Sequence, residues 1–256
     1  MERLKGKVCV ITGCSSGIGR QIAIRFSAEG ANLAICARRS ELLEETALLC
    51  RKNGAEVIAK AFDLSDELET RNFIDRVAEK YGRIDVLVNN ACSRVHGKPF
   101  LDQTVDDLML PIRTGLIPTW RMMQLCFPLM KEQGGSIINT GSSSEDGGIG
   151  YAGYGAAKAA ISCLSRSVAL EFGEYNIRVN NIFPVTMTDT MYGQVSSDFS
   201  DERRAIITEN LKKNALHRVG DAYKDVTPVH VFLASDESGW ITGQNICAEG
   251  GQIIHR

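Results

Sequence analysis

Two tyrosines and one lysine stand close together in the stretch GIGYAGYGAAKAA, residues 148–160. If this stretch is helical, Tyr151, Tyr154 and Lys158 share one broad face, because positions three, four and seven residues apart nearly superimpose. A tyrosine with a pKa near ~10 is a poor acid or base at neutral pH, but a nearby ammonium favours the phenolate. The pattern therefore indicates proton transfer by a tyrosine, with an ordinary exposed tyrosine–lysine pair as the alternative.

A glycine-rich turn, TGCSSGIG at residues 12–19, follows the first apolar run. Gly13 would permit a tight turn, Gly17 would let the backbone approach a pyrophosphate, and Gly19 would let a helix pack close to the strand. The N–H groups of the helix that starts there would bind phosphate oxygens. The turn therefore predicts a dinucleotide site, at which we expect Gly13, Ser15, Ser16, Gly17, Ile18 and Gly19.

The end of the second apolar run indicates which dinucleotide binds. A NAD site wants a carboxylate for the ribose 2′-hydroxyl about twenty residues further on. The segment ICARRSE places Ala37 where that acid would stand, followed by Arg38 and Arg39. Guanidinium groups match a 2′-phosphate bidentately, whereas an acid would repel it. We expect NADP(H) to be favoured over NAD(H), with Arg38 as the contact. Two solvated arginines at a helix start are the alternative.

These residues need a scaffold that brings strand ends together. Short β-rich runs are expected at 7–13, 32–37, 55–62, 84–90, 135–141, 177–183 and 245–249. Helices are expected at 17–30, 40–54, 66–82, 103–132, 151–173, 201–213 and 222–234. The alternation predicts an α/β fold: a Rossmann-type, doubly wound parallel sheet of about seven strands, flanked by helices on both faces. We expect residues 1–256 to form one domain, including a polar substrate loop at about 185–215.

Composition narrows the class of protein. The 256 residues carry a formal net charge of −2, so electrostatics give no reason to expect nucleic acid or an anionic membrane as a partner. No stretch reaches the apolar length that crosses a bilayer, and the N-terminus lacks a signal-peptide layout. The eight cysteines form no CxxC pair and no Cys/His cluster at ligand spacing. We expect a reduced, cytoplasmic protein without a structural metal.

Taken together, the motifs resemble those of the short-chain dehydrogenase/reductase family, in its single-domain branch. The run NNAC at 89–92 looks like the family's Asn-Asn-Ala-Gly. The run GSIINTGSS at 135–143 looks like the strand that delivers the active-site serine, and YGAAK at 154–158 looks like the Tyr-x-x-x-Lys helix. Any one piece is common, but their order and spacing along nearly the whole chain are specific.

The resemblance implies a mechanism for the tyrosine and the lysine. Tyr154, four residues before Lys158, would donate a proton to a carbonyl oxygen while NADPH delivers hydride to the carbon. Lys158 would also bind the hydroxyls of the nicotinamide ribose. Tyr151 would then be a wall or helix-start residue.

The resemblance also implies a serine that stabilises the developing charge on the substrate oxygen. We choose Ser142 over its neighbours Ser143 and Ser144 from its place after INTG. The remaining implied cofactor contacts are Asp63 and Leu64 at the adenine, Asn89 near the adenosine ribose, and the backbone near Met187 at the nicotinamide carboxamide.

Three positions depart from the family's pattern. Gly115 stands where the family commonly has an asparagine that bends its helix and completes a proton relay. Our hypothesis is that Pro118 supplies the bend and that the carbonyl of Thr114, left unpaired, holds a water. Cys92 and Val185 replace usual glycines and reshape the pocket. Bacterial enzymes of this family that act at the steroid 12α-hydroxyl also have glycine in place of the asparagine, which hints at the substrate.

The substrate is expected outside the carboxyl ends of the strands, facing segments 92–100, 143–151 and 185–199. An apolar, adaptable lid would be formed by Met187, Met191, Tyr192, Val195 and Phe199. Such a lid suggests an alicyclic, aromatic or steroid-like ketone or alcohol. As the alternative, these residues simply pack the loop. His96 could touch the substrate, although a lone loop histidine is more often solvated.

The sequence therefore predicts an NADP(H)-dependent oxidoreductase that interconverts a secondary alcohol and a ketone. A dehydrogenase of the same family that prefers NAD is one alternative. A catalytically weak nucleotide-binding sensor or scaffold is the other. The resemblance further implies a homo-oligomer, a tetramer or dimer, formed through helices 103–132 and 151–173.

Overall fold

The computed structural model describes residues 2–95, 97–188 and 200–252, and one parallel sheet runs through its centre. Seven strands lie in the order β3-β2-β1-β4-β5-β6-β7. Their bounds are β1 Val8–Thr12, β2 Asn32–Ala37, β3 Val57–Ala61, β4 Val86–Asn89, β5 Gly135–Thr140, β6 Ile177–Pro184 and β7 Asn245–Ala248. The order confirms the predicted Rossmann-type, doubly wound sheet.

Side chains of the inner strands alternate between two apolar layers. In β1, Cys9 and Ile11 pack into one layer, and Val8 and Val10 pack into the other. Neighbouring strands run parallel in register, with Val10 opposite Leu87 of β4. Because both faces of the sheet are covered, these strands read as continuous apolar runs in the sequence.

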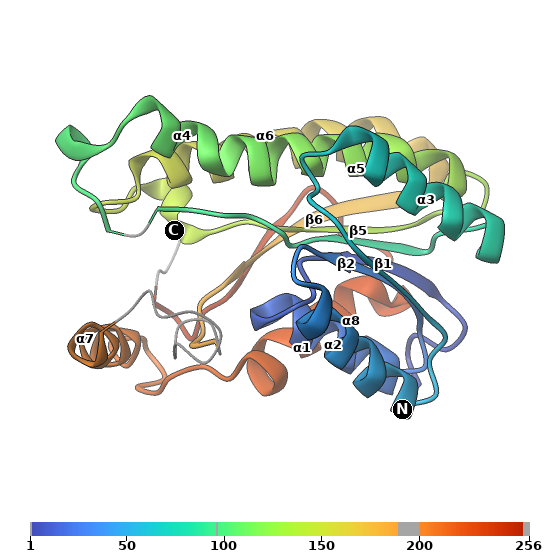
Figure 1. Cartoon of the computed structure of the whole chain (residues 1–256), viewed down its shortest axis with the longest axis horizontal. Helices are drawn as coiled ribbons and strands as arrows, with labels where there is room; N and C mark the ends of the chain where they lie inside the picture. The colour runs from blue at the N-terminus through green and yellow to red at the C-terminus, as the bar shows by residue number, and fades with distance from the viewer. Residues whose placement is uncertain (1, 96, 189–199, 253–256) are drawn as a thin grey trace.

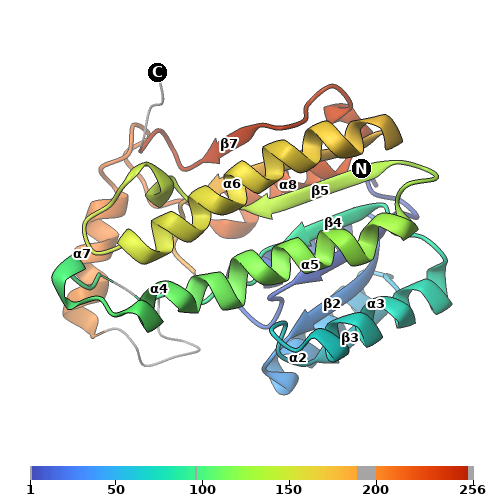
Figure 2. The same cartoon turned by 90° about the horizontal axis from the view of Figure 1, so that it is seen from above.

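Helices cover the sheet on both faces (Figure 1). One face carries α1 Gly17–Ala28, α2 Ser40–Lys52 and α8 Thr227–Ala234. The other carries α3 Glu67–Tyr81, α5 Ile117–Cys126 and α6 Ala152–Phe172, which lie side by side in Figure 2. Phe26 of α1 and Phe73 of α3 are both fully buried, one in each layer.

The long helical region predicted at 103–132 is divided into several pieces. Helix α4 (Val105–Pro111) starts at Thr104, whose hydroxyl and backbone form a capping box with Asp107. A π-helical turn, Ile112–Leu116, separates α4 from α5, and Pro118 lies in the first turn of α5. The region is therefore not a straight α-helix. The interruption lies just before Pro118, in the part of the helix that carries Gly115.

The strand order reverses between β1 and β4, and ligands of such sheets bind outside the carboxyl ends of the strands at this point. Figure 2 shows α4 and α7 (Asp201–Leu211) at the end toward which the strands point. Within residues 2–95, 97–188 and 200–252, no helix combines the length and apolar character that a membrane span needs.

Candidate active site

The turn between β1 and α1 has backbone conformations that favour glycine. The φ angle is +77° at Gly13 and +61° at Gly17. A β-carbon on Gly19 would lie 2.3 Å from the carbonyl oxygen of Gly13, so the turn rests directly on the first turn of α1. Ile18 between them packs partly buried against the core. The three glycines thus have the positions that the dinucleotide motif requires.

Arg39 connects this turn to the end of β2. Its Nη2 donates to the Oγ of Ser16 at 2.5 Å and to the Oγ of Ser15 at 3.1 Å. Both serines are residues that the sequence predicted at the dinucleotide site. The sequence singled out Arg38 there, and the contacts of Arg39 with the turn were not predicted.

Arg38, the first residue after β2, lies close enough to Asp63, after β3, for its charge to act on that carboxyl. The backbone N–H of Ser65 lowers the pKa of Asp63, and the positive charge of Arg38 lowers it further. Leu64 beside it is buried, and its carbonyl accepts from Nη1 of Arg121 at 3.3 Å. Arg38, Asp63 and Leu64 are therefore gathered at one edge of the sheet, as an adenine site would need.

The side chain of Asn89 is hydrogen-bonded within the sheet. It is buried at the end of β4, and its Nδ2 donates to Oδ1 of Asn139 in β5 at 2.9 Å. The next residue, Asn90, donates from Nδ2 to the Thr12 carbonyl at 3.1 Å. Asn89 thus joins the ends of β4 and β5, and Asn90 joins the end of β4 to that of β1 at the switch point. A cofactor contact by Asn89 stays a prediction.

Tyr154 and Lys158 lie one turn apart at the start of α6. Their residues are 8% and 2% exposed, so both side chains are largely withdrawn from water. Lys158 Nζ donates to the carbonyl of Thr140 at the end of β5, at 2.5 Å, and lies 5.5 Å from the ring centroid of Tyr154. Tyr151 is the N-cap residue of α6, and its ring lies edge-on to that of Tyr154 at 6.4 Å.

Ser142 begins the loop that connects β5 to α6. Its Oγ accepts from the backbone N–H of Ser144 at 3.1 Å and lies 3.2 Å from the Ser144 Oγ. A β-carbon on Gly155 of α6 would lie 2.3 Å from the carbonyl oxygen of Ser144. The serine loop is thus in backbone contact with the helix that carries Tyr154.

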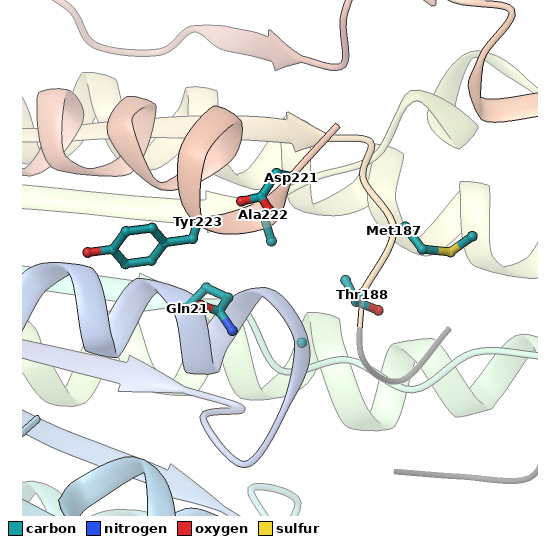
Figure 3. A pocket seen from close by; sticks show the side chains of 7 residues that line it. Gln21, Met187, Thr188, Asp221, Ala222 and Tyr223 are labelled. Carbon is teal, nitrogen blue, oxygen red and sulfur yellow. The ribbon is translucent and has the colours of Figure 1, made fainter. Parts of the chain in front are cut away.

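Met187 lies where the segment after β6 approaches the glycine turn. It is 5% exposed and forms an isolated parallel bridge with Asp221. A cavity of about 170 Å³ is lined by Gly17, Gln21, Met187, Thr188, Asp221, Ala222 and Tyr223. Figure 3 shows Met187 and Thr188 on one side of it and Gln21 and Tyr223 on the other. Two segments predicted to hold one cofactor therefore share one cavity.

Cys92 and Gly115, two of the departures from the family's pattern, lie against each other. A β-carbon on Gly115 would lie 2.7 Å from the Sγ of Cys92. The next residue, Ser93, donates its backbone N–H to Oγ1 of Thr114 at 2.9 Å, and that hydroxyl donates to the carbonyl of Leu110 at 2.7 Å. The π-helical turn and the segment after β4 are joined here. A water on the Thr114 carbonyl stays a prediction.

Arg94, two residues after Cys92, contacts the tyrosine that the sequence predicts as the acid. Its Nη1 donates to the Tyr154 Oη at 3.4 Å, and its Cζ lies 5.0 Å from the ring centroid. No motif in the sequence marks Arg94 as a site residue. The available signal was a basic residue in segment 92–100, which was expected to face the substrate.

The residues present fit a nicotinamide dinucleotide. Thr140, whose backbone carbonyl accepts from Lys158, has a buried side-chain hydroxyl with no hydrogen-bond partner within the part of the chain that the structure describes. A polar group of a bound ligand would satisfy this hydroxyl. The glycine turn, the two arginines and Asp63 lie at the carboxyl ends of β1, β2 and β3. Val185 also lies at this edge, where its N–H donates to the carbonyl of Ala248 at 3.1 Å.

Several predicted pocket residues lie outside the described residues. These are His96, Met191, Tyr192, Val195 and Phe199. The described wall of the pocket therefore consists of the segments 92–95, 97–100, 143–151 and 185–188.

Comparisons with known proteins cover nearly the whole chain. A family model described as Enoyl-(Acyl carrier protein) reductase matches residues 13–252. The chain is 37% identical to a 12alpha-hydroxysteroid dehydrogenase of a Clostridium species over 254 residues, 96% of each chain. It is 33% identical to a 1,6-dihydroxycyclohexa-2,4-diene-1-carboxylate dehydrogenase of Pseudomonas putida, over 98% of this chain and 94% of the relative. A solved structure of NAD+-bound xylitol dehydrogenase is similar with a TM-score of 0.89 and 29% identity, over 97% of this chain and 100% of that one.

Proposed function

The chain belongs to the short-chain dehydrogenase/reductase family, and on that premise we propose that it interconverts a secondary alcohol and a ketone with NADP(H). The observation that carries the proposal is the pair Tyr154 and Lys158, one helical turn apart and largely buried at the carboxyl edge of the sheet. The three relatives named above are dehydrogenases, of a 12alpha-hydroxysteroid, of a dihydroxycyclohexadiene carboxylate and of xylitol, which supports the proposal.

In the direction of reduction, Tyr154 gives its phenolic proton to the carbonyl oxygen of the substrate. A reduced nicotinamide, when held by the glycine turn and Lys158, would supply the hydride to the carbonyl carbon, so that proton and hydride together would give a secondary alcohol. Lys158, held by the carbonyl of Thr140, keeps a positive charge beside the phenol that has lost its proton. Ser142 donates to the substrate oxygen as negative charge develops there. In oxidation Tyr154 takes the alcohol proton back.

We propose NADP(H) over NAD(H) because Ala37 provides no carboxylate for a ribose 2′-hydroxyl, while Arg38 and Arg39 lie at the same strand end. Arg38 lies near Asp63, and Arg39 donates to the glycine turn. The NAD+-bound xylitol dehydrogenase is a structural relative that uses the other cofactor, so a preference for NAD is the runner-up.

We propose an alicyclic, aromatic or steroid-like substrate. Two relatives are named for ring alcohols, one for a steroid and one for a cyclohexadiene diol. The resemblance implies that enzymes acting at the steroid 12α-hydroxyl also have glycine at the position of Gly115. Cys92 and Val185 replace glycines of the family's pattern near the predicted pocket, and we propose that they help to set its shape.

We propose that the chain assembles as a homo-oligomer, a tetramer or dimer, in the cytoplasm. A groove of about 870 Å³ runs between α5 and α6, and its lining is mainly apolar. Trp120 is 54% exposed beside it. An exposed apolar patch of this kind marks a contact surface, and the same two helices of a second copy are its proposed occupant. All eight cysteines are free thiols, which suits a reducing compartment.

The test is oxidation of NADPH and of NADH with a panel of cyclic ketones and of ketosteroids that differ in the position of the carbonyl. Turnover that prefers NADPH supports the proposal, provided that Tyr154→Phe abolishes it and still binds the nucleotide. Ser142→Ala is expected to lower turnover strongly, while Ser143→Ala leaves it nearly unchanged. Tight binding of NADPH without turnover of any ketone would favour the sensor or scaffold instead.

A further inference from the structure

Arg94 and Lys158 contact the same aromatic ring from different elements. Lys158 lies on α6 itself, is 2% exposed and donates to the Thr140 carbonyl. Arg94 is half-buried on the segment that follows β4, with its Cζ 5.0 Å from the Tyr154 centroid. The mechanism uses the lysine. It gives no role to the arginine, although Nη1 of Arg94 reaches the Tyr154 Oη itself at 3.4 Å.

The segment that carries Arg94 is fixed on both sides. Before it, Cys92 packs against Gly115 and the Ser93 N–H donates to Oγ1 of Thr114 at 2.9 Å. After it, the Lys98 N–H donates to the carbonyl of Gly150 at 3.2 Å. The guanidinium is therefore presented from a braced segment at the carboxyl edge of β4. That edge is where this sheet places its ligands.

The substrate oxygen must come within hydrogen-bond distance of the Tyr154 Oη, about 2.7 Å away. A guanidinium nitrogen 3.4 Å from the same Oη then lies within reach of groups attached one or two carbons from the reacting carbon. The planar donor fork of arginine matches a carboxylate bidentately. A contact of 3.4 Å to a neutral phenol is long and is readily exchanged for a charged acceptor.

We propose that Arg94 is a specificity-determining residue that binds a carboxylate on the substrate, placed one or two carbons from the carbonyl that Tyr154 protonates. This inference rests on the proposed function of the site. The substrate class is then a 2-oxo or 3-oxo acid, or the corresponding hydroxy acid.

The experiment compares acids with their neutral esters as substrates. Benzoylformate is paired with methyl benzoylformate, and acetoacetate with methyl acetoacetate, in steady-state reduction by the full-length enzyme. In the wild type we expect the acids to be preferred. In Arg94→Ala the KM of the acids should rise roughly 10- to 100-fold, because a charge-assisted pair is lost, while kcat/KM of the esters changes less than about 3-fold. Arg94→Lys should be intermediate.

A matched control removes the same charge nearby. Arg113 is exposed in the π-helical turn, and Arg113→Ala should leave KM and kcat/KM unchanged for all four substrates. If Arg94→Ala lowers kcat/KM equally for the acids and the esters, Arg94 acts through Tyr154 and the inference is wrong. A wild type that reduces esters and disfavours acids would also overturn it, while leaving the reductase function intact.

Binding of an unreactive acid decides the case in which no ketone is reduced. Benzoate is titrated by calorimetry into the wild type and into Arg94→Ala, each saturated with NADP+. Loss of benzoate affinity in the variant, with unchanged NADP+ affinity, supports the anion site even without turnover. Equal benzoate affinity in both proteins, or none in the wild type, overturns it.

Discussion

The Sγ of Cys92 occupies the space in which a side chain at position 115 would begin, 2.7 Å from a β-carbon placed there. The β-carbon of Cys92 would lie 3.3 Å from the same point. Both positions depart from the family's pattern: the family usually has glycine where this chain has Cys92, and asparagine where this chain has Gly115. The two departures therefore compensate each other: the side chain of Cys92, after β4, fills space that a side chain at position 115 in the π-helical turn would otherwise take.

This exchange predicts coupled stability. Gly115→Ala should lower the free energy of unfolding by roughly 1–3 kcal/mol, because the thiol of Cys92 must shift to admit a methyl group. Together with Cys92→Gly the additional cost of the alanine should largely disappear. Urea unfolding of the two single variants and the double variant measures the coupling. Gly173→Ala is the control, because a β-carbon there meets no atom within 4 Å. An equal cost of Gly115→Ala with and without Cys92 would contradict the idea.

The two arginines after β2 should have separable effects on nucleotide binding. Arg38→Ala should weaken NADPH at least about 10-fold and leave NADH within roughly 3-fold, because only NADPH carries the phosphate that a guanidinium would pair with. Arg39→Ala should weaken both cofactors, since Arg39 also holds Ser15 and Ser16 of the glycine turn. Dissociation constants from the quenching of protein fluorescence test this. If neither variant loses affinity for NADPH selectively, the NAD-preferring alternative is favoured.

His230 predicts a loss of stability in mild acid. Burial in α8 lowers the pKa of His230 to about 4, although its Nδ1 lies 3.1 Å from the Val226 carbonyl. An unfolded histidine has a pKa near ~6.5, so between these values the unfolded chain binds a proton that the folded protein excludes. Stability should therefore fall as the pH drops from about 6.5 to about 4, by up to on the order of 3 kcal/mol, with no further loss from this group below that.

The measurement is urea unfolding of His230→Leu and the wild type across that pH range. The leucine variant should show a shallower dependence on pH, whatever its absolute stability. His217→Asn is the control. His217 is exposed with a φ of +52°, a conformation that asparagine also adopts. Identical pH slopes in the wild type and His230→Leu would show that other groups cause the acid loss.

The apolar groove between α5 and α6 predicts the assembly. Trp120→Lys places a charge at its rim, which should shift the sedimenting species toward lower mass because the charge would be buried between two copies. Leu68→Lys on α3 makes the same change at a residue that is 66% exposed and outside the groove, and should leave the mass unchanged. A wild type that sediments as a monomer would refute the homo-oligomer.

The strands were predictable because burial on both faces gives each an unbroken apolar run. The glycine turn and the Tyr154–Lys158 helix were predictable because local spacing defines them. The π-helical turn was not, because its backbone depends on contacts with the segment after β4. The contact of Cys92 with Gly115 was not predictable either, because the two residues are 23 positions apart and no local pattern links them. The contacts of Arg39 with the glycine turn and of Arg94 with Tyr154 were not predictable, because a basic residue at a strand end reads as a solvated side chain until its partners are in place.

The serine loop lies directly against the helix that holds the tyrosine, at Gly155. Because a β-carbon at position 155 would lie 2.3 Å from the carbonyl oxygen of Ser144, any larger residue there would push the loop and the helix apart. A substitution at position 155 would therefore change the distance between the predicted proton donor and the predicted charge-stabilising serine without altering either residue.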